Sequence, residues 1–165
     1  NVIVTSSTTK IYGLGGLHTG WIVAPDEVAA QCQRVKAHST GAASFTSELL
    51  TARVLSVARI ELIKRFQKRA KTNLEYLRKW MNEHTEFFEF VEPDGGIVCF
   101  PKYTMEIPSL ELCKYLFDTQ KILVNPGVYF NLEGCIRLSY GCYESVLQNA
   151  LDALEKGLMS LKSCV

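Results

Sequence analysis

The chain has 165 residues, of which 47% are hydrophobic and 21% charged, and its formal net charge at pH 7 is +1. This length suits one ordinary domain, or a small domain with part of another, and the apolar content excludes a disordered chain. The small net charge argues against binding of nucleic acid or a membrane surface mainly by electrostatics, and no apolar run is long enough to span a membrane.

The first quarter of the sequence predicts two strands, a helix and a loop. The β-branched run at 1–5 predicts a buried strand, and residues 17–24 predict a second. A proline followed by two acidic residues predicts the start of a helix over 26–38, and small residues at 39–44 predict a loop. Because the sequence begins at Asn1, inside a strand pattern, we expect it to be the latter part of a longer protein.

A long helical pattern covers residues 46–83, with apolar residues at every third or fourth position. A helix of about 38 residues would extend roughly 57 Å, at about 1.5 Å per residue. A compact domain of this size does not need such a length. The pattern therefore predicts a helix, straight or kinked, that joins two domains.

The remaining residues predict a separate α+β unit. Two apolar runs at 87–93 and 96–103 flank a Pro-Asp-Gly-Gly sequence, which predicts a β-hairpin. Ser109 is predicted to cap a helix that ends near 119. The other expected elements are two strands and a closing amphipathic helix, at 121–125, 135–141 and 144–163.

The six cysteines form no Cys-x-x-Cys pair, and none has a histidine at metal-ligand spacing. Most stand among apolar residues, where a thiol packs as a small hydrophobic group. We therefore expect reduced core cysteines, no metal site and a cytoplasmic protein, with disulfides as the alternative.

One stretch, SSTTKIYGLGGLHTGW at 6–21, places a single lysine between hydroxyl residues and four glycines. It is no phosphate loop, because Trp21 stands where that motif needs lysine, and it is no dinucleotide fingerprint, because His18 replaces the third glycine. Lys10 lies between a predicted strand and a glycine turn, where backbone can approach a ligand closely. A desolvated, neutral lysine amine can attack an aldehyde. The alternative is an ordinary exposed lysine at the edge of a loop.

The same stretch resembles the cofactor-lysine signature of the class I/II aminotransferases, which are fold-type I pyridoxal-phosphate enzymes. That signature has a hydroxyl residue, two variable positions, the lysine, a Gly-x-x-Gly stretch and a basic residue eight positions after the lysine. Three further segments resemble the family's loop and helix that reach the partner subunit, its small-domain hairpin and its arginine strand. They are HSTGAASFTSELLTARVL (38–55), PDGGIVCFPKY (93–103) and NPGVYFNLEGCIRLSYG (125–141).

The resemblance implies a role for four residues. Lys10 would be the Schiff-base lysine and would carry the proton between the substrate Cα and the cofactor. Ser7 would contact the cofactor phosphate, and Arg137 would bind the substrate α-carboxylate. His18 stands where the family usually has an arginine against the phosphate, so we expect looser cofactor binding there. The alternatives are an ordinary loop hydroxyl for Ser7, a surface ion pair for Arg137 and a packed histidine for His18.

The resemblance also implies an α+β fragment of an α/β fold-type I enzyme. Residues 1–45 would be the C-terminal remnant of the large cofactor-binding domain, and residues 46–84 a long interdomain helix. Residues 85–165 would form the C-terminal small domain, with an antiparallel sheet and helices.

The implied function is that of a pyridoxal-phosphate-dependent aminotransferase, which moves an amino group between an amino acid and a 2-oxo acid. The intact protein is expected to be a homodimer that binds neither nucleic acid nor a membrane. The chain alone is expected to be inactive, because the family's acidic partner of the pyridine nitrogen lies upstream of the lysine strand. Two alternatives stay open: another fold-type I enzyme such as a lyase, and a non-catalytic α+β module that binds a protein partner.

Overall fold

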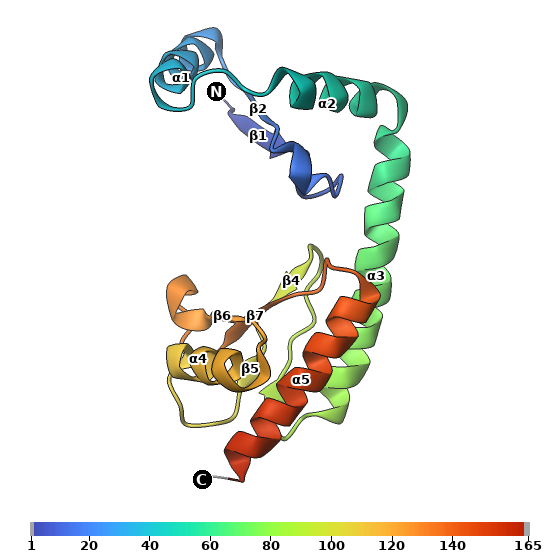
Figure 1. Cartoon of the computed structure of the whole chain (residues 1–165), viewed down its shortest axis with the longest axis vertical. Helices are drawn as coiled ribbons and strands as arrows, with labels where there is room; N and C mark the ends of the chain where they lie inside the picture. Colours follow the sequence, from blue (N-terminus) through green and yellow to red (C-terminus); the bar gives the residue numbers. More distant parts are fainter. Residues whose placement is uncertain (1, 164–165) are drawn as a thin grey trace. The chain divides into compact units, whose positions relative to one another are not determined.

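The computed structural model describes residues 2–163 (Figure 1), and the chain forms two compact units that divide between Gln67 and Lys68. Helix α3 (Arg59–Glu83) contributes residues to both units. Within the described range, no helix is both long enough and apolar enough to pass through a bilayer.

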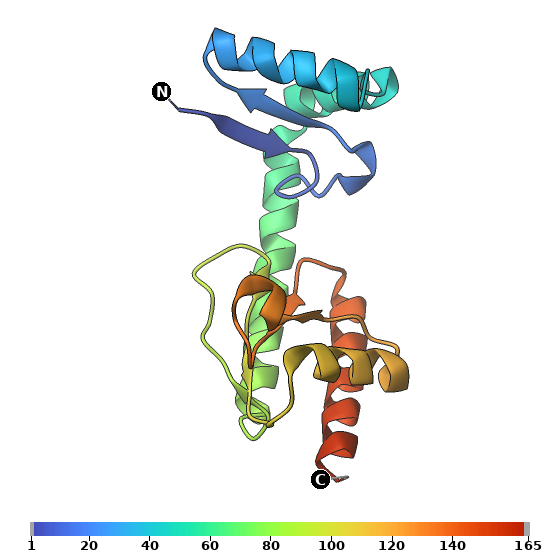
Figure 2. The ribbon, with the colours of Figure 1, turned by 90° about the vertical axis from the view of Figure 1, so that its left-hand side faces the viewer.

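The first unit contains a β-hairpin followed by helices (Figure 2). Strands β1 (Val4–Ser7) and β2 (Gly20–Val23) pair antiparallel, and a short 3-10 turn, η1 (Gly15–Leu17), lies in the loop between them. Helices α1 (Asp26–Ser39) and α2 (Phe45–Val57) follow. The predicted strands and the first helix are therefore present, with ends shifted by at most three residues, and the prediction for Asn1 lies outside the described residues. The prediction that the first strand is buried is wrong for this chain, since Ile3 and Val4 are 54% and 50% exposed.

The helix predicted over 46–83, straight or kinked, is present in two parts, α2 and α3, that meet at Ala58. The backbone of Ala58, at φ −127° and ψ 7°, leaves the helical region. Its N–H still donates to Val54 O at 2.9 Å, and its carbonyl still accepts from Leu62 N–H at 3.0 Å. The break thus needs no proline or glycine, and apolar residues recur through it, so the sequence carries no local sign of it.

The second unit packs helices against two small antiparallel sheets. One sheet pairs β3 (Phe88–Glu89) with β5 (Lys102–Tyr103), and the other has the order β4-β7-β6. The remaining elements are β4 (Val98–Cys99), α4 (Ser109–Gln120), β6 (Asn125–Pro126), the 3-10 turn η2 (Gly127–Phe130), β7 (Ile136–Ser139) and α5 (Glu144–Lys162). Its most deeply buried apolar side chains are Leu77, Leu112, Leu116, Ile136 and Leu158, all 0% exposed.

The hairpin predicted from the runs at 87–93 and 96–103 is present at its outer end, where Phe88 of β3 lies opposite Tyr103 of β5 and Glu89 lies opposite Lys102. Nearer the Pro-Asp-Gly-Gly turn the two runs do not pair with each other, and β4 pairs with β7 instead. Cys99 and Leu138 are partners in that second pairing, and both are buried. Burial against the core strand β7 therefore decides where β4 pairs, in place of the local turn signal.

Helix α4 is capped at its N-terminus by a residue far along the chain. Ser109 is the first helical residue, so its predicted role as the cap is wrong. Its backbone N–H and its hydroxyl both donate to the Glu133 carboxylate, at 2.6 and 2.9 Å. These hydrogen bonds lower the pKa of Glu133, since they stabilise the charged form at the positive end of the helix.

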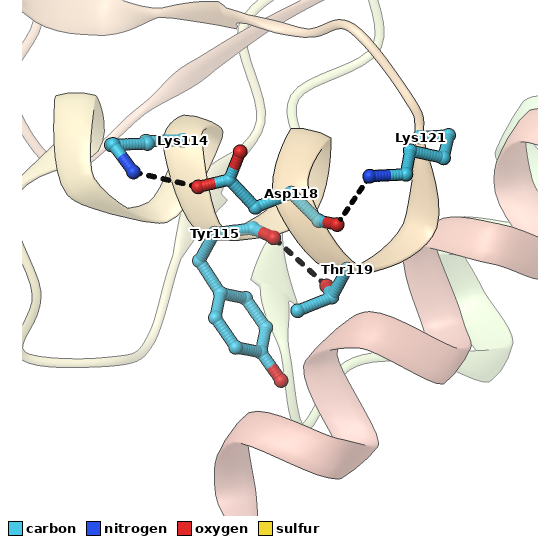
Figure 3. Close-up of polar contacts among 5 residues, drawn as sticks. All are labelled: Lys114, Tyr115, Asp118, Thr119 and Lys121. Atoms are coloured by element: carbon cyan, nitrogen blue, oxygen red, sulfur yellow. Dashed lines mark hydrogen bonds and ion pairs between the residues drawn. The ribbon is translucent and has the colours of Figure 1, made fainter.

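The C-terminus of α4 is closed by local contacts, shown in Figure 3. Lys121 takes the left-handed conformation at φ 58°, and its Nζ donates to the Asp118 carbonyl oxygen at 2.8 Å. Lys114 Nζ donates to Asp118 Oδ2 at 2.6 Å, and Thr119 Oγ1 donates to Tyr115 O. A cation at this end stabilises carbonyls that have no partner within the helix.

The cysteines of the described range are free thiols. Cys99 and Cys113 are core residues, and burial raises their pKa to about 12 and about 11. Cys32 is exposed on α1, against the expectation of a core position, and Cys164 lies outside the described residues.

Candidate functional site

Lys10 stands in a tight turn directly after β1. Gly13 N–H donates to the Lys10 carbonyl at 3.0 Å, and Gly13 has φ +66°, a conformation that favours glycine. The Lys10 side chain is exposed, and in the described part of the chain no carboxylate forms an ion pair with it. The turn therefore presents an unpaired primary amine.

The lysine turn is held in place by Thr8, a residue that the sequence did not single out. Thr8 is fully buried, and both its N–H and its hydroxyl donate to the Thr19 carbonyl, at 2.9 and 3.1 Å. Its own carbonyl accepts from Leu14 N–H at 2.9 Å. Thr8 thus closes the loop that carries Lys10. Its neighbours Ser6, Ser7 and Thr9 also carry hydroxyl groups, so only its burial in the folded protein distinguishes Thr8 from them.

Ser7 lies beside the lysine turn. It is half-buried at the end of β1, and with Lys10 it lines a shallow hollow of about 430 Å³ whose other walls are Thr5, Ser6 and Ile11. The predicted hydroxyl and the predicted amine therefore meet at one surface.

His18 ends the η1 turn in the same loop. It is exposed and takes a left-handed conformation at φ 49°, and its N–H donates to Gly15 O at 3.2 Å. Within residues 2–163 the imidazole of His18 is therefore not packed into a core.

These donors fit pyridoxal phosphate. The cofactor carries an aldehyde, which a free lysine amine can bind, and a phosphate, which hydroxyl and imidazole donors can bind. Ser7 and Lys10 supply a hydroxyl and an amine at one hollow, whereas His18, in the loop that follows, does not line this hollow. Residues 2–163 hold no cluster of three or more side chains suited to a metal ion.

Arg137 belongs to the second unit, where it is half-buried on β7 opposite Asn125 of β6. Its guanidinium lies 5.6 Å from the centre of the Phe130 ring, and no carboxylate within residues 2–163 forms an ion pair with it. It lines a largely apolar cavity of about 330 Å³ between β6, β7 and α5. A guanidinium without an acidic partner is available to a carboxylate ligand.

The turn that carries Phe130 is fixed by close backbone packing. A Cβ on Gly127 would lie 2.0 Å from Leu132 O, so only glycine fits there. Val128 N–H donates to Ser109 Oγ at 3.2 Å, which ties η2 to the start of α4. The ring beside Arg137 therefore stands on a well-supported turn.

Comparison with known proteins gives one family and many structural neighbours. The family described as aminotransferase class I and II matches residues 1–154. The chain is 28% identical to a bifunctional aspartate aminotransferase and glutamate/aspartate-prephenate aminotransferase of Petunia hybrida, over 97% of the chain and 36% of that protein. It is 26% identical to capreomycidine synthase of Streptomyces vinaceus, over 95% of the chain and 40% of that protein.

Two solved structures share the fold across almost the whole chain. A PLP-dependent aminotransferase from Streptococcus suis matches with a TM-score of 0.88 at 24% identity, over 96% of the chain and 42% of that structure. The PLP-dependent cyclase OrfR matches with a TM-score of 0.85 at 28% identity, over 96% of the chain and 43% of that structure. The predicted fold class is confirmed by these neighbours, and the chain spans about two fifths of their length.

Proposed function

Because the chain belongs to the class I and II aminotransferase family, we propose that it forms the cofactor-lysine and arginine-strand part of a pyridoxal-phosphate-dependent aminotransferase. The reaction moves an amino group between an amino acid and a 2-oxo acid. The observation that carries this proposal is Lys10, an unpaired amine in a glycine turn directly after a strand.

Lys10 has two tasks in this proposal. Its Nζ would hold the cofactor covalently and, once released by the substrate amine, would carry the proton between the substrate Cα and the aldehyde carbon of the cofactor, first as base and then as acid. Pyridoxal phosphate, when bound, supplies an electron sink for the electrons left at that carbon. Ser7 Oγ donates to a phosphate oxygen from the wall of the hollow that it shares with Lys10. His18 adds positive charge near the phosphate only when protonated, which supports weaker binding than arginine would give.

Arg137 binds the substrate in this proposal. Its planar guanidinium grips the α-carboxylate through two parallel hydrogen bonds and keeps its charge at any physiological pH. The absence of a competing ion pair among the described carboxylates supports this role.

Covalent trapping tests the proposal. The full-length protein that carries this chain is incubated with pyridoxal phosphate, reduced with borohydride and digested, and the labelled peptide is identified by mass spectrometry. We expect the label on Lys10 and its loss in Lys10→Ala, which should also lose transamination between L-aspartate and 2-oxoglutarate. Lys36→Ala, which changes an exposed lysine of α1, should keep both. Label on another lysine, or none, contradicts the proposed role of Lys10.

A second candidate is a pyridoxal-phosphate-dependent cyclase. The likeness to the PLP-dependent cyclase OrfR favours it, since that match covers 96% of the chain at 28% identity. The two functions differ in their need for an amino acceptor. A transaminase requires a 2-oxo acid for each turnover, whereas a cyclase consumes its amino acid without one, so product formation with and without 2-oxoglutarate separates them.

The domain boundaries, the homodimer and the cytoplasmic location also stay part of the proposal. Residues 1–45, 46–84 and 85–165 are the proposed domain remnant, interdomain helix and small domain. Exposed apolar side chains on α2, with Phe45 at 77% and Leu49 at 58% exposure, support a protein surface that covers this helix. Sedimentation of the full-length protein measures its assembly directly.

A further inference from the structure

Asn73 is a polar residue on the core side of α3, and only 1% of it is exposed. Its side-chain amide donates to two backbone carbonyls, Tyr140 O at 2.7 Å and Cys142 O at 2.9 Å. Its Oδ1 has no partner within the described residues. A buried oxygen without a partner destabilises the fold, so packing alone does not account for asparagine at this position.

The two carbonyls belong to the segment that leaves β7, the strand of Arg137. β7 ends at Ser139, and Tyr140 N–H donates to Ile97 O at 2.9 Å. Gly141 is packed so closely that a Cβ there would lie 2.8 Å from Ile97 Cδ1. The segment 140–142 is therefore held from one side by Ile97 and from the other by the Asn73 amide.

Neighbouring core positions on the same helix are apolar. Leu77 and Met81 stand one and two turns after Asn73, with exposures of 0% and 1%. A leucine at position 73 would continue this pattern and leave no unpaired oxygen, but it would release both carbonyls. Positions where a sequence departs from its own core pattern often serve function.

We propose that Asn73 is a positioning residue for the α-carboxylate site. Its amide fixes the end of β7 three to five residues beyond Arg137, and so sets the direction of the guanidinium. The inference rests on the proposed substrate role of Arg137, because Asn73 itself touches no substrate.

The test uses the full-length protein loaded with pyridoxal phosphate and two amino donors, L-aspartate and its α-amide. Only L-aspartate carries the α-carboxylate that Arg137 would bind. The ratio of kcat/KM for L-aspartate to kcat/KM for the α-amide therefore measures the contribution of this interaction. Asn73→Leu should lower the ratio by about tenfold or more, since small displacements of a binding group can reduce rates up to about a hundredfold. General destabilisation would lower both kcat/KM values together and leave the ratio unchanged.

Three further variants make the result decisive. Leu77→Ala removes a buried side chain of the same helix that has no bond to the segment, and it should keep the ratio. Gly141→Ala moves the segment without touching Asn73 and should lower the ratio. The added Ile97→Ala change should restore the ratio in part, because it removes the atoms at 2.8 and 3.2 Å from the new Cβ and leaves Ile97 Cβ at 3.0 Å. If Asn73→Leu does not fold, as judged by circular dichroism, the Gly141 pair decides.

These outcomes distinguish a failure of the proposed role of Arg137 from a failure of the positioning role of Asn73. Arg137→Leu should abolish the preference for L-aspartate, and if it does not, the proposed role of Arg137 is wrong and the inference falls with it. If Arg137→Leu abolishes the preference but folded Asn73→Leu leaves it intact, only the positioning role of Asn73 is overturned. Where Asn73→Leu does not fold, Gly141→Ala takes its place in this comparison.

Discussion

Replacement of Glu155 by glutamine should remove a pH-dependent part of the stability of the second unit. His84 joins the end of α3 to α5, and its Nε2 lies 3.2 Å from Glu155 Oε1. Its Nδ1 lies 2.7 Å from the Trp80 carbonyl oxygen, and its ring stacks on Trp80 with the centroids 4.0 Å apart. A carbonyl and a carboxylate both only accept hydrogen bonds, so both contacts form at full strength only when the ring is doubly protonated.

The sign of the pH dependence follows from the pKa of His84. Burial lowers this pKa, but the hydrogen bonds to Trp80 and Glu155 and the charges of Glu155 and Glu86 outweigh burial, so it is raised from the ordinary 6.5. Because the folded protein holds the proton more tightly than the unfolded chain, the stabilisation is complete below about pH 6.5 and is lost as the pH rises through the folded-state value.

The geometry sets the size of the effect. Hydrogen bonds to charged groups contribute about 1.5–3 kcal/mol, and the exposure of Glu155 reduces this through solvent screening. The side chains of His84 and Glu155 are 11% and 33% exposed. We therefore expect Glu155→Gln to lower the free energy of unfolding by about 1 kcal/mol at pH 6, and by clearly less at pH 8.5.

Urea unfolding followed by tryptophan fluorescence measures this difference. The chain has two tryptophans, so a Trp21→Phe background leaves Trp80, which stacks directly on the imidazole, as the reporter. Asp118→Asn is the control, because it removes the exposed pair with Lys114 and should have little effect at either pH. An equal loss of stability at pH 6 and pH 8.5 in Glu155→Gln would refute the argument that His84 is charged in the folded protein.

Two further changes test the support of the arginine strand and its neighbours. Glu133→Gln should lower the melting temperature at pH 7 and lower it by less at pH 3, because hydrogen bonds with Ser109 lower the pKa of Glu133 and the stabilisation that they give declines as the carboxylate is protonated. Melting curves at the two pH values measure this difference. Gly127→Ala should lower the free energy of unfolding by about 1–3 kcal/mol, because the new Cβ would overlap Leu132 O. Gly95→Ala is the matched control, because a Cβ there meets nothing within 4 Å. Equal stability of the two variants would contradict the packing argument.

The candidate site could be predicted in part. The hydroxyl run, the lysine and the glycines placed Lys10 in a turn after a strand, and the structure has this turn. The apolar run around Arg137 predicted a strand, which is β7. The supports of these residues could not be predicted, because Thr8 and Asn73 have no local pattern that separates them from ordinary loop and helix residues.

The sequence by itself determined the order and type of most helices and strands, since these depend on the spacing of apolar residues and on local turn chemistry. It also determined which amine and which guanidinium are candidates for chemistry. Only the tertiary structure decided that β4 pairs with β7, that Glu133 caps α4 and that Asn73 holds the end of β7. The physical reason is that strand partners, distant caps and buried donors are selected by burial among residues far apart in the chain, where each backbone group still requires a partner.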